Sequence, residues 1–335
     1  MTAKLRGVVV PGCAFLILSL FVYALAHISA STDVPEDAKS SFASGDYPKA
    51  IEILIRAAAV SPDDAAVQHL LGRSYFQNEQ FDRAISAAEK SVALDPKNSV
   101  YHEWLGHAYG EKADRSGWFS ALSFAKKARK EFEIAVQLDP HNYAAMQAMI
   151  EFDCSAPGMA GGGEDKARPE IEKLSMLDAA EGRYAAGNCR RQKKDFEAAD
   201  IEFQKALALQ PKSASLIYDI GDYYMKRNQA DRLWVVVKEG GRADSQDPRG
   251  EFYKYVAYTI QKEKSAECAP YFRDYIAHSI KRDDYPSKSM AHYWLGRIQE
   301  NQNDTAGARQ EYREAVHLEP RNRYAKEALS RLQRD

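Results

Sequence analysis

The stretch AAVQHLLGRSYFQNEQFDRAISAAEKSVALDPKN, residues 65–98, contains two apolar patterns of helical period separated by a polar turn at residues 77–80. The first pattern carries Leu71, Gly72 and Tyr75, and the second carries Phe81, Ala84, Ala88 and Val92. The triplet Leu94-Asp95-Pro96 ends the second pattern, because proline cannot continue a helix. The stretch therefore predicts two short helices joined by a tight turn.

The order Leu-Gly-x-x-Tyr, then Phe-x-x-Ala, then Pro resembles the tetratricopeptide repeat, a helix–turn–helix unit of 34 residues. We expect Gly72 and Ala84 where the two helices cross, since a larger side chain would push them apart. Tyr75 and Phe81 are expected to fill the space between one unit and the next. A single unit cannot bury its apolar faces, so several must stack.

The resemblance covers residues 35–335. It implies an all-α fold, a right-handed superhelical solenoid of about eight helix pairs with a C-terminal capping helix, preceded by an N-terminal apolar helix. The expected repeats span residues 35–64, 65–98, 99–142, 143–179, 180–213, 214–249, 250–288 and 289–322, and the cap spans residues 323–335. The seventh repeat departs most from the family spacing.

Two consecutive repeats look longer than the family unit at the turn between their helices. Pro96 and Pro140 are 44 residues apart, so about ten extra residues are expected between Gly110 and Phe124. The next repeat has a glycine-rich turn at residues 156–163, which is similar to a turn in a subset of exported bacterial tetratricopeptide proteins. Stacking predicts one insertion-edge cluster, either self-capped, which we favour, or open for partner docking: Trp118, Phe119, Pro157 and Met159.

The N-terminus differs in kind from the repeats. Lys4 and Arg6 precede residues 7–26, which are uncharged and long enough to cross a bilayer. Ala24-Leu25-Ala26 also offers a cleavage site, so residues 1–30 are predicted to be either a signal peptide or a single transmembrane anchor. Both alternatives place the chain after a linker at residues 31–34 outside the cytoplasm, in the periplasm if the source is bacterial.

The 4 cysteines do not follow a metal-ligand or CxxC spacing. Cys154 and Cys189 fall late in the first helices of successive repeats. We favour buried free thiols at these positions, and a disulfide of an oxidising compartment is the alternative.

Nothing in the sequence predicts catalysis, a cofactor or a metal site. His102 and His107 are five residues apart, which directs their rings about 140° apart on a helix rather than to one face. The glycines at residues 158–163 precede Glu164 and Asp165 instead of the Lys and Ser or Thr of a phosphate-binding loop. The chain is therefore not expected to be an enzyme. Its net charge of −2, with no domain of a single sign, argues against a nucleic-acid partner, which would need a clustered basic surface.

The family resemblance implies that the first helices line a groove that binds a protein or peptide segment. Matching repeat positions gives these groove candidates: His69, Arg73, Phe76, Glu103, His107, Gln147, Glu151, Tyr184, Asn188, Arg191, Tyr218, Asp222, Met225, Tyr293 and Arg297. The family's carboxylate clamp is not reproduced, because Ala144 and Ala148 stand at cationic positions.

We therefore predict a non-catalytic protein-interaction scaffold acting outside the cytoplasm, at or near the membrane through its N-terminal segment. The alternatives are an accessory subunit of an envelope enzyme or assembly machine, and a groove binder of a small or polymeric ligand such as a glycan. The sequence does not determine the partner or the oligomeric state.

Overall fold

The computed structural model describes residues 34–333 except Asp283, and α-helices account for most of this part of the chain. The predicted apolar segment lies outside the described residues. The helices are α1 Glu36–Ala43, α2 Tyr47–Val60, α3 Ala65–Gln77, α4 Phe81–Leu94, α5 Ser99–Asp114, α6 Trp118–Leu138, α7 Tyr143–Ser155, α8 Glu164–Leu177, α9 Ala179–Gln192, α10 Phe196–Ala208, α11 Ala214–Lys226, α12 Ala230–Ala243, α13 Arg249–Gln261, α14 Ser265–His278, α15 Lys288–Asn301, α16 Thr305–Leu318 and α17 Arg323–Leu332, with a short 3₁₀ turn, η1 Gly158–Ala160.

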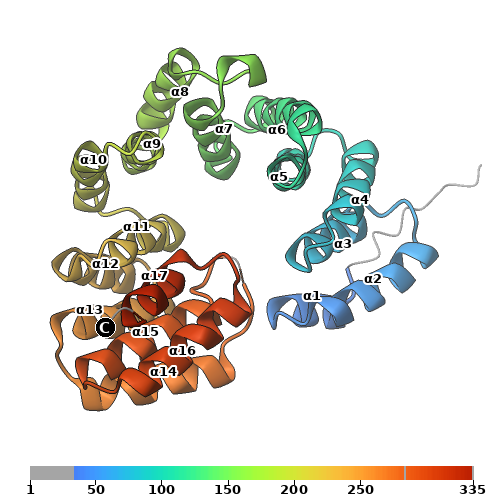
Figure 1. Cartoon of the computed structure of the whole chain (residues 1–335). Helices are drawn as coiled ribbons and strands as arrows, with labels where there is room; N and C mark the ends of the chain where they lie inside the picture. Colours follow the sequence, from blue (N-terminus) through green and yellow to red (C-terminus); the bar gives the residue numbers. More distant parts are fainter. Residues whose placement is uncertain (1–33, 283, 334–335) are drawn as a thin grey trace, which may run out of the picture. The chain divides into compact units, whose positions relative to one another are not determined.

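The helices pair in chain order, and successive pairs stack against each other (Figure 1). The predicted all-α solenoid is confirmed for this part of the chain, with α17 packed on α16 as the expected final helix. In Figure 1, α3, α5, α7, α9 and α11 lie on the inner side of the curve that they form, and α4, α6, α8, α10 and α12 lie on its outer side.

The long third repeat differs from the expectation. The extra residues do not form a long turn, because only residues 115–117 separate α5 from α6. Instead α5 has 16 residues against 13 in α3, and α6 has 21 residues against 14 in α4. Residues 118–125 contain no helix breaker, so adding them to an existing helix costs less than ordering a new loop. The insertion therefore lengthens the helix pair beyond its neighbours.

A close contact between a glycine and an aromatic ring recurs inside the repeats. A Cβ built on Gly106, Gly187 or Gly296 would lie 2.6, 2.5 or 2.6 Å from the ring of Phe132, Phe203 or Tyr312, respectively. In the second repeat a Cβ on Gly72 would instead lie 3.3 Å from the Ala88 nitrogen and 3.4 Å from the Ala84 carbonyl oxygen. The expectation that Gly72 and Ala84 meet at the helix crossing is confirmed.

Buried polar groups connect neighbouring repeats. Asn142 caps α7 by accepting from the Ala145 amide, and its Nδ2 donates to Ser99 Oγ at 2.8 Å. Ser99 Oγ in turn donates to the Ala135 carbonyl at 2.9 Å, near the end of α6. The same relay recurs at the last repeat through Asn322, Ser289 and Ala315. Each relay fixes the start of one repeat against both helices of the repeat before it.

The connection between α14 and α15 explains why the seventh repeat looks irregular. Lys281 of this connection contacts the first repeat, where the Tyr47 hydroxyl donates to the Lys281 carbonyl at 2.5 Å. Lys281 Nζ also lies 3.0 Å from a Glu79 carboxylate oxygen. Gly45 has a positive φ of 75°, and a Cβ there would lie 3.0 Å from the Lys281 carbonyl oxygen. The conformation of this connection therefore depends on contacts with residues far away in the sequence rather than on contacts within the seventh repeat.

Gly187→Ala should destabilise the protein by about 1–3 kcal/mol, because the new methyl group overlaps the Phe203 ring. Gly241→Ala in α12 is the matched control, since no atom outside its own helix lies within 4 Å of a Cβ there. We expect this control to be neutral or stabilising by up to about 1 kcal/mol, because alanine favours helix more than glycine does. Urea unfolding followed by circular dichroism measures both. Equal losses in the two variants would contradict the packing argument.

Candidate functional site

The predicted groove residues lie on six first helices, but they divide into an accessible and a buried group. Those with accessible side chains are His69, Arg73, Phe76, His107, Gln147, Glu151, Tyr184, Arg191, Asp222 and Arg297. The buried ones are Glu103, Asn188, Tyr218, Met225 and Tyr293. The candidate binding surface therefore narrows to the first group.

The buried group has structural partners, which corrects the expectation that it faces a ligand. The Tyr218 ring stacks on Tyr253 with centroids 5.5 Å apart and planes 8° apart. Tyr293 packs 5.2 Å from the Trp294 ring centroid. Glu103 accepts a hydrogen bond from Asn142 Nδ2 at 2.9 Å, and burial raises the pKa of its carboxyl group. These side chains belong to the contacts between repeats.

The accessible residues of the first repeats meet in a cavity of about 580 Å³, which we call the Arg73 pocket. Its lining combines side chains of the first three repeats with two from the α14–α15 connection: Phe42, Ala43, Tyr47, Arg73, Phe76, Gln77, Trp104, His107, Arg282 and Asp284. The Arg73 guanidinium carbon lies 4.8 Å from the Phe42 ring centroid and 4.4 Å from the Trp104 ring centroid. Two aromatic rings thus hold the guanidinium in place.

The electrostatics of this pocket follow from burial. Burial, with a smaller contribution from Arg73, lowers the pKa of His69 to about 3, and burial lowers the pKa of His107 to about 4. Both imidazoles are therefore neutral at pH 7. Burial also lowers the pKa of Arg73, although not enough to remove its charge. Among the described residues, His69 Nδ1 and Arg73 Nε are buried polar atoms that lack a hydrogen-bond partner. The pocket thus holds the Arg73 cation between two aromatic rings, and its second cation, Arg282, is paired with Asp284.

Sequence reasoning found Arg73, Phe76 and His107 but missed the rest of this pocket. Trp104 directly follows a predicted groove residue. Its aromatic side chain next to that position could have marked it in the sequence as a further pocket residue. Arg282 and Asp284 left no such signal, because they lie more than 200 positions from Arg73 in the chain.

A second part of the inner side, at α9 and α11, is acidic. The Tyr184 hydroxyl donates to Asp219 Oδ2 at 3.2 Å, and Asp222 lies one helical turn further along α11. The protein packed around Asp219, followed by the Asp222 charge, raises the pKa of Asp219 to about 6, although the residue keeps an exposed surface and Tyr184, Arg249 and Arg191 act in the opposite direction. Asp219 therefore changes its charge at mildly acidic pH.

The insertion edge brings together three of the four predicted residues. Trp118, Pro157 and Met159 line a cavity of about 290 Å³ between α6 and the turn after α7. Phe119 is not part of the lining and is 88% exposed. Trp118 and Met159 remain 66% and 62% exposed, so the cluster does not cap itself as we favoured. Trp118 is the first residue of the lengthened α6.

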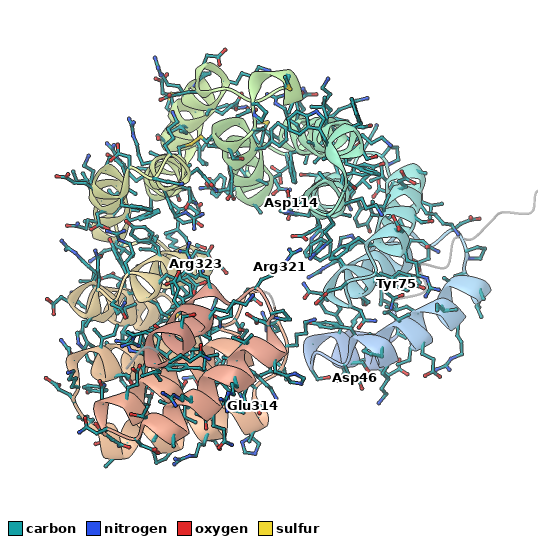
Figure 2. The ribbon with its side chains drawn as sticks, viewed as in Figure 1. Asp46, Tyr75, Asp114, Glu314, Arg321 and Arg323 are labelled. Atoms are coloured by element: carbon teal, nitrogen blue, oxygen red, sulfur yellow. A yellow bond between two sulfur atoms is a disulfide. The ribbon has the colours of Figure 1, made fainter. Side chains whose placement is uncertain are left out.

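Side chains from the C-terminal repeats also approach the inner side. Figure 2 labels Arg321 and Arg323, which lie just before and at the start of α17. Arg323 lines a cavity together with Tyr223 of α11, and Arg321 lines an adjoining cavity with Asp222. The last helix therefore contributes side chains to the same region as α11.

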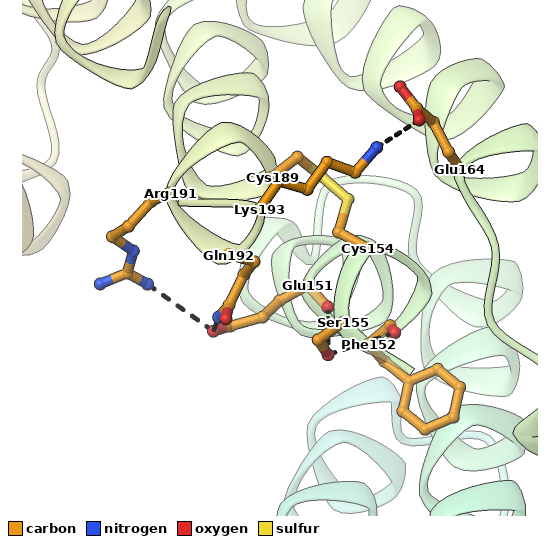
Figure 3. Close-up of a disulfide and its surroundings, with 9 residues drawn as sticks. All are labelled: Glu151, Phe152, Cys154, Ser155, Glu164, Cys189, Arg191, Gln192 and Lys193. Atoms are coloured by element: carbon orange, nitrogen blue, oxygen red, sulfur yellow. Dashed lines mark hydrogen bonds and ion pairs between the residues drawn. A yellow bond between two sulfur atoms is a disulfide. The ribbon is translucent and has the colours of Figure 1, made fainter. Parts of the chain in front are cut away.

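The cysteines form a disulfide, which corrects our preference for free thiols. Cys154 of α7 and Cys189 of α9 are bonded, with Cα atoms 5.3 Å apart (Figure 3). Gln192 Nε2 also donates to Glu151 Oε1 at 2.8 Å across the same pair of helices. The two residues approach because α7 and α9 are both first helices and stack directly on each other. Cys268 is free and buried.

In the described part of the chain, no group of three or more His, Cys, Asp or Glu side chains is arranged to hold a metal ion. His102 is buried, with Nδ1 2.6 Å from Glu131 Oε2 and Nε2 3.1 Å from the Pro96 carbonyl oxygen. His107 lines the Arg73 pocket, so the two histidines do not converge. None of the helices between residues 34 and 333 is both long and apolar enough to cross a membrane.

Three sequence profiles, each described as a tetratricopeptide repeat, match residues 41–106, 180–213 and 261–323. The chain is a tetratricopeptide repeat protein. These matches include the first, second, fifth and eighth helix pairs, where the glycine and small-residue positions are most regular. A comparison with curated proteins found no match.

The chain is also similar to several solved structures. Yeast Tom70 has a TM-score of 0.58 and 14% sequence identity, over 92% of this chain and 66% of its own. A tetratricopeptide repeat protein from Parabacteroides merdae has a TM-score of 0.45 and 14% identity, over 90% of this chain and 98% of its own. A thermophilic tetratricopeptide protein of Thermus thermophilus has a TM-score of 0.45 and 19% identity, over 56% of this chain and 95% of its own. At these identities the likeness to Tom70 shows the fold alone.

Removing the disulfide should cost about 3 kcal/mol of stability, because the bond closes a loop between residues 35 positions apart in the sequence. Cys154→Ser, Cys189→Ser and the double variant should lose similar amounts, since either single change already removes the bond. A non-reducing peptide map checks the pairing, and thermal unfolding checks the cost. Additive losses in the double variant would mean that the two cysteines act independently.

The raised pKa of Asp219 predicts a pH dependence of stability. Between about pH 4 and the folded value of about 6, the folded protein binds this proton more tightly than the unfolded chain does. As the pH rises through this window, Asp219 therefore lowers the free energy of unfolding. In Asp219→Asn this contribution should disappear, and the melting temperature should rise relative to the wild type above pH 6. Asp63→Asn, in the exposed α2–α3 connection, is the control and should leave the pH profile unchanged.

Proposed function

We propose that this protein is a non-catalytic scaffold that binds segments of partner proteins along the inner side of its repeats, outside the cytoplasm and near the membrane. Membership of the tetratricopeptide family supports the binding of proteins or peptides. The Arg73 pocket is the observation that carries the proposal for this chain. It combines an accessible cavity with a half-buried cation whose Nε has no hydrogen-bond partner among the described residues.

The pocket has the properties of a side-chain recognition site. Phe42 and Trp104 fix the Arg73 guanidinium, so little side-chain entropy remains to be lost when a ligand binds. The guanidinium can donate to a backbone carbonyl or a carboxylate of a partner, while Phe76 and Trp104 provide apolar contact. Aromatic and arginine side chains in a desolvated cavity are the typical anchors of protein interfaces.

Two observations support a location outside the cytoplasm. The uncharged residues 7–26 follow Lys4 and Arg6, as in export signals and membrane anchors. The Cys154–Cys189 disulfide is a bond that persists in oxidising compartments and is rare in the cytosol. An exported chain that keeps residues 7–26 would hold its partners at the membrane, and one that loses them would act as a soluble scaffold.

In-cell photocrosslinking tests the binding side. A photoreactive phenylalanine analogue at Phe76, in the Arg73 pocket, should crosslink to one dominant partner protein. The same analogue at Met176, an 81% exposed side chain on α8, is the control and should not. Mass spectrometry of the purified N-terminus decides in the same experiment between an intact anchor and cleavage near residue 26 or 30. Equal crosslinking from both positions would contradict binding on the inner side.

Arg73→Gln then tests the pocket itself. The substitution should weaken partner capture about tenfold, because it removes the fixed charge while keeping hydrogen-bonding capacity. Arg313→Gln on α16 makes the same charge change at an exposed position and should leave capture unchanged. A partner that binds both variants equally would not use the Arg73 pocket.

A further inference from the structure

A second cavity, of about 610 Å³, lies between α9, the start of α10, α11 and α17, and it differs from the Arg73 pocket in its charge. We call it the basic pocket. Its lining consists of four cationic, three aromatic and one amide side chain: Arg191, Lys226, Arg227, Arg323, Phe196, Tyr223, Tyr324 and Asn228. No carboxylate belongs to this lining, although the whole chain carries a net charge of −2.

The aromatic rings of this pocket hold arginines rather than presenting open faces. The Arg227 guanidinium carbon lies 4.7 Å from the Phe196 ring centroid and 5.4 Å from that of Tyr223. The Arg323 guanidinium carbon lies 4.9 Å from the Tyr324 ring centroid, and its Nη2 lies 2.9 Å from the Tyr324 hydroxyl oxygen. A guanidinium stacked in this way keeps its N–H edge available for an acceptor.

The nearby carboxylates neutralise only part of this positive charge. Lys226 Nζ pairs with Asp222 at 3.2 Å, and Arg191 Nη2 approaches Glu151 only to 3.7 Å. Arg191 Nε is buried and without a hydrogen-bond partner. Across residues 34–333, leaving aside Asp283, neither Arg227 nor Arg323 pairs with a carboxylate within 4 Å. The pocket therefore has an unbalanced positive charge fixed by aromatic contacts.

We propose that the basic pocket binds the carboxylates of an acidic peptide segment of a partner protein. The inference rests on the proposed scaffold function and names the chemistry of one partner. Stacked guanidinium groups match carboxylates through paired N–H donors, and arginines fixed before binding lose little entropy when they pair. The Oδ1 of Asn228 accepts a hydrogen bond from Arg297 Nη1 at 2.9 Å, which leaves its Nδ2 to donate to a peptide carbonyl.

The geometry favours a peptide over a nucleic acid. Single-stranded nucleic acids bind by stacking bases on open aromatic faces, and here arginines occupy the faces of Phe196, Tyr223 and Tyr324. The cavity is bounded by four helices and has the volume of a few side chains. It does not continue into the long basic track that a nucleic-acid backbone needs, because Asp222 and Glu319 line the adjoining cavity.

Fluorescence anisotropy with a labelled octapeptide of alternating aspartate and glutamate tests this inference on the full chain with its disulfide intact. The expected result is saturable binding that weakens as salt rises from about 50 to 300 mM, since the pairs are partly exposed. An octapeptide of alternating asparagine and glutamine should not bind. Arg227→Ala combined with Arg323→Ala should weaken binding of the acidic peptide at least tenfold. These two changes leave no carboxylate unpaired, so the fold should remain intact by circular dichroism.

Arg190→Ala combined with Arg313→Ala is the matched control, because it removes the same charge from exposed positions outside the pocket. Its effect should stay below twofold. An equal loss in both double variants, or equal competition by dextran sulfate and by unlabelled acidic peptide, would overturn the assignment in favour of non-specific attraction of anions. If no acidic peptide binds while crosslinking at Phe76 still captures a partner, this inference fails and the scaffold function stands.

Discussion

Three of the repeats depend on a close contact between a glycine in the first helix and a ring in the helix that follows. Phe203 lies so near the backbone of Gly187 that even a methyl group would overlap it, and Tyr312 on Gly296 repeats the arrangement. This contact brings the helix axes together and places the ring where it can also touch the next repeat. The same glycine therefore allows the repeats to stack, and the stacked repeats form the inner side.

Close packing also limits which inner-side residues can meet a partner. Tyr218 and Tyr293 stand at positions that the family pattern assigns to the groove, yet neighbouring rings cover both. Arg73 remains partly accessible and Arg227 exposed, and aromatic rings support both guanidinium groups. The inner side therefore offers a partner a small number of cationic side chains that pack on aromatic rings.

The middle of the chain departs from the regular repeat, and a disulfide bond stabilises this part of the stack. The lengthened α6 and the glycine-rich turn after α7 leave Trp118 exposed at one edge. Immediately beside them the Cys154–Cys189 bond joins α7 to α9. A covalent link between successive first helices keeps the stack intact where the regular contacts are interrupted. The connection from α14 to α15 has a comparable role at the first repeat, through Lys281 and Tyr47.

The sequence by itself determined the helix pairs and their order, because Gly72, Ala84 and Pro96 act within one or two turns of helix. It also identified Arg73 as a groove residue, since a repeat position fixes the side of the helix. Only the tertiary structure decided that Tyr218 is buried, that Cys154 bonds to Cys189, and that Arg323 joins Arg227 in one pocket. Those outcomes depend on distances between residues far apart in the chain, and a local periodic pattern carries no information about them.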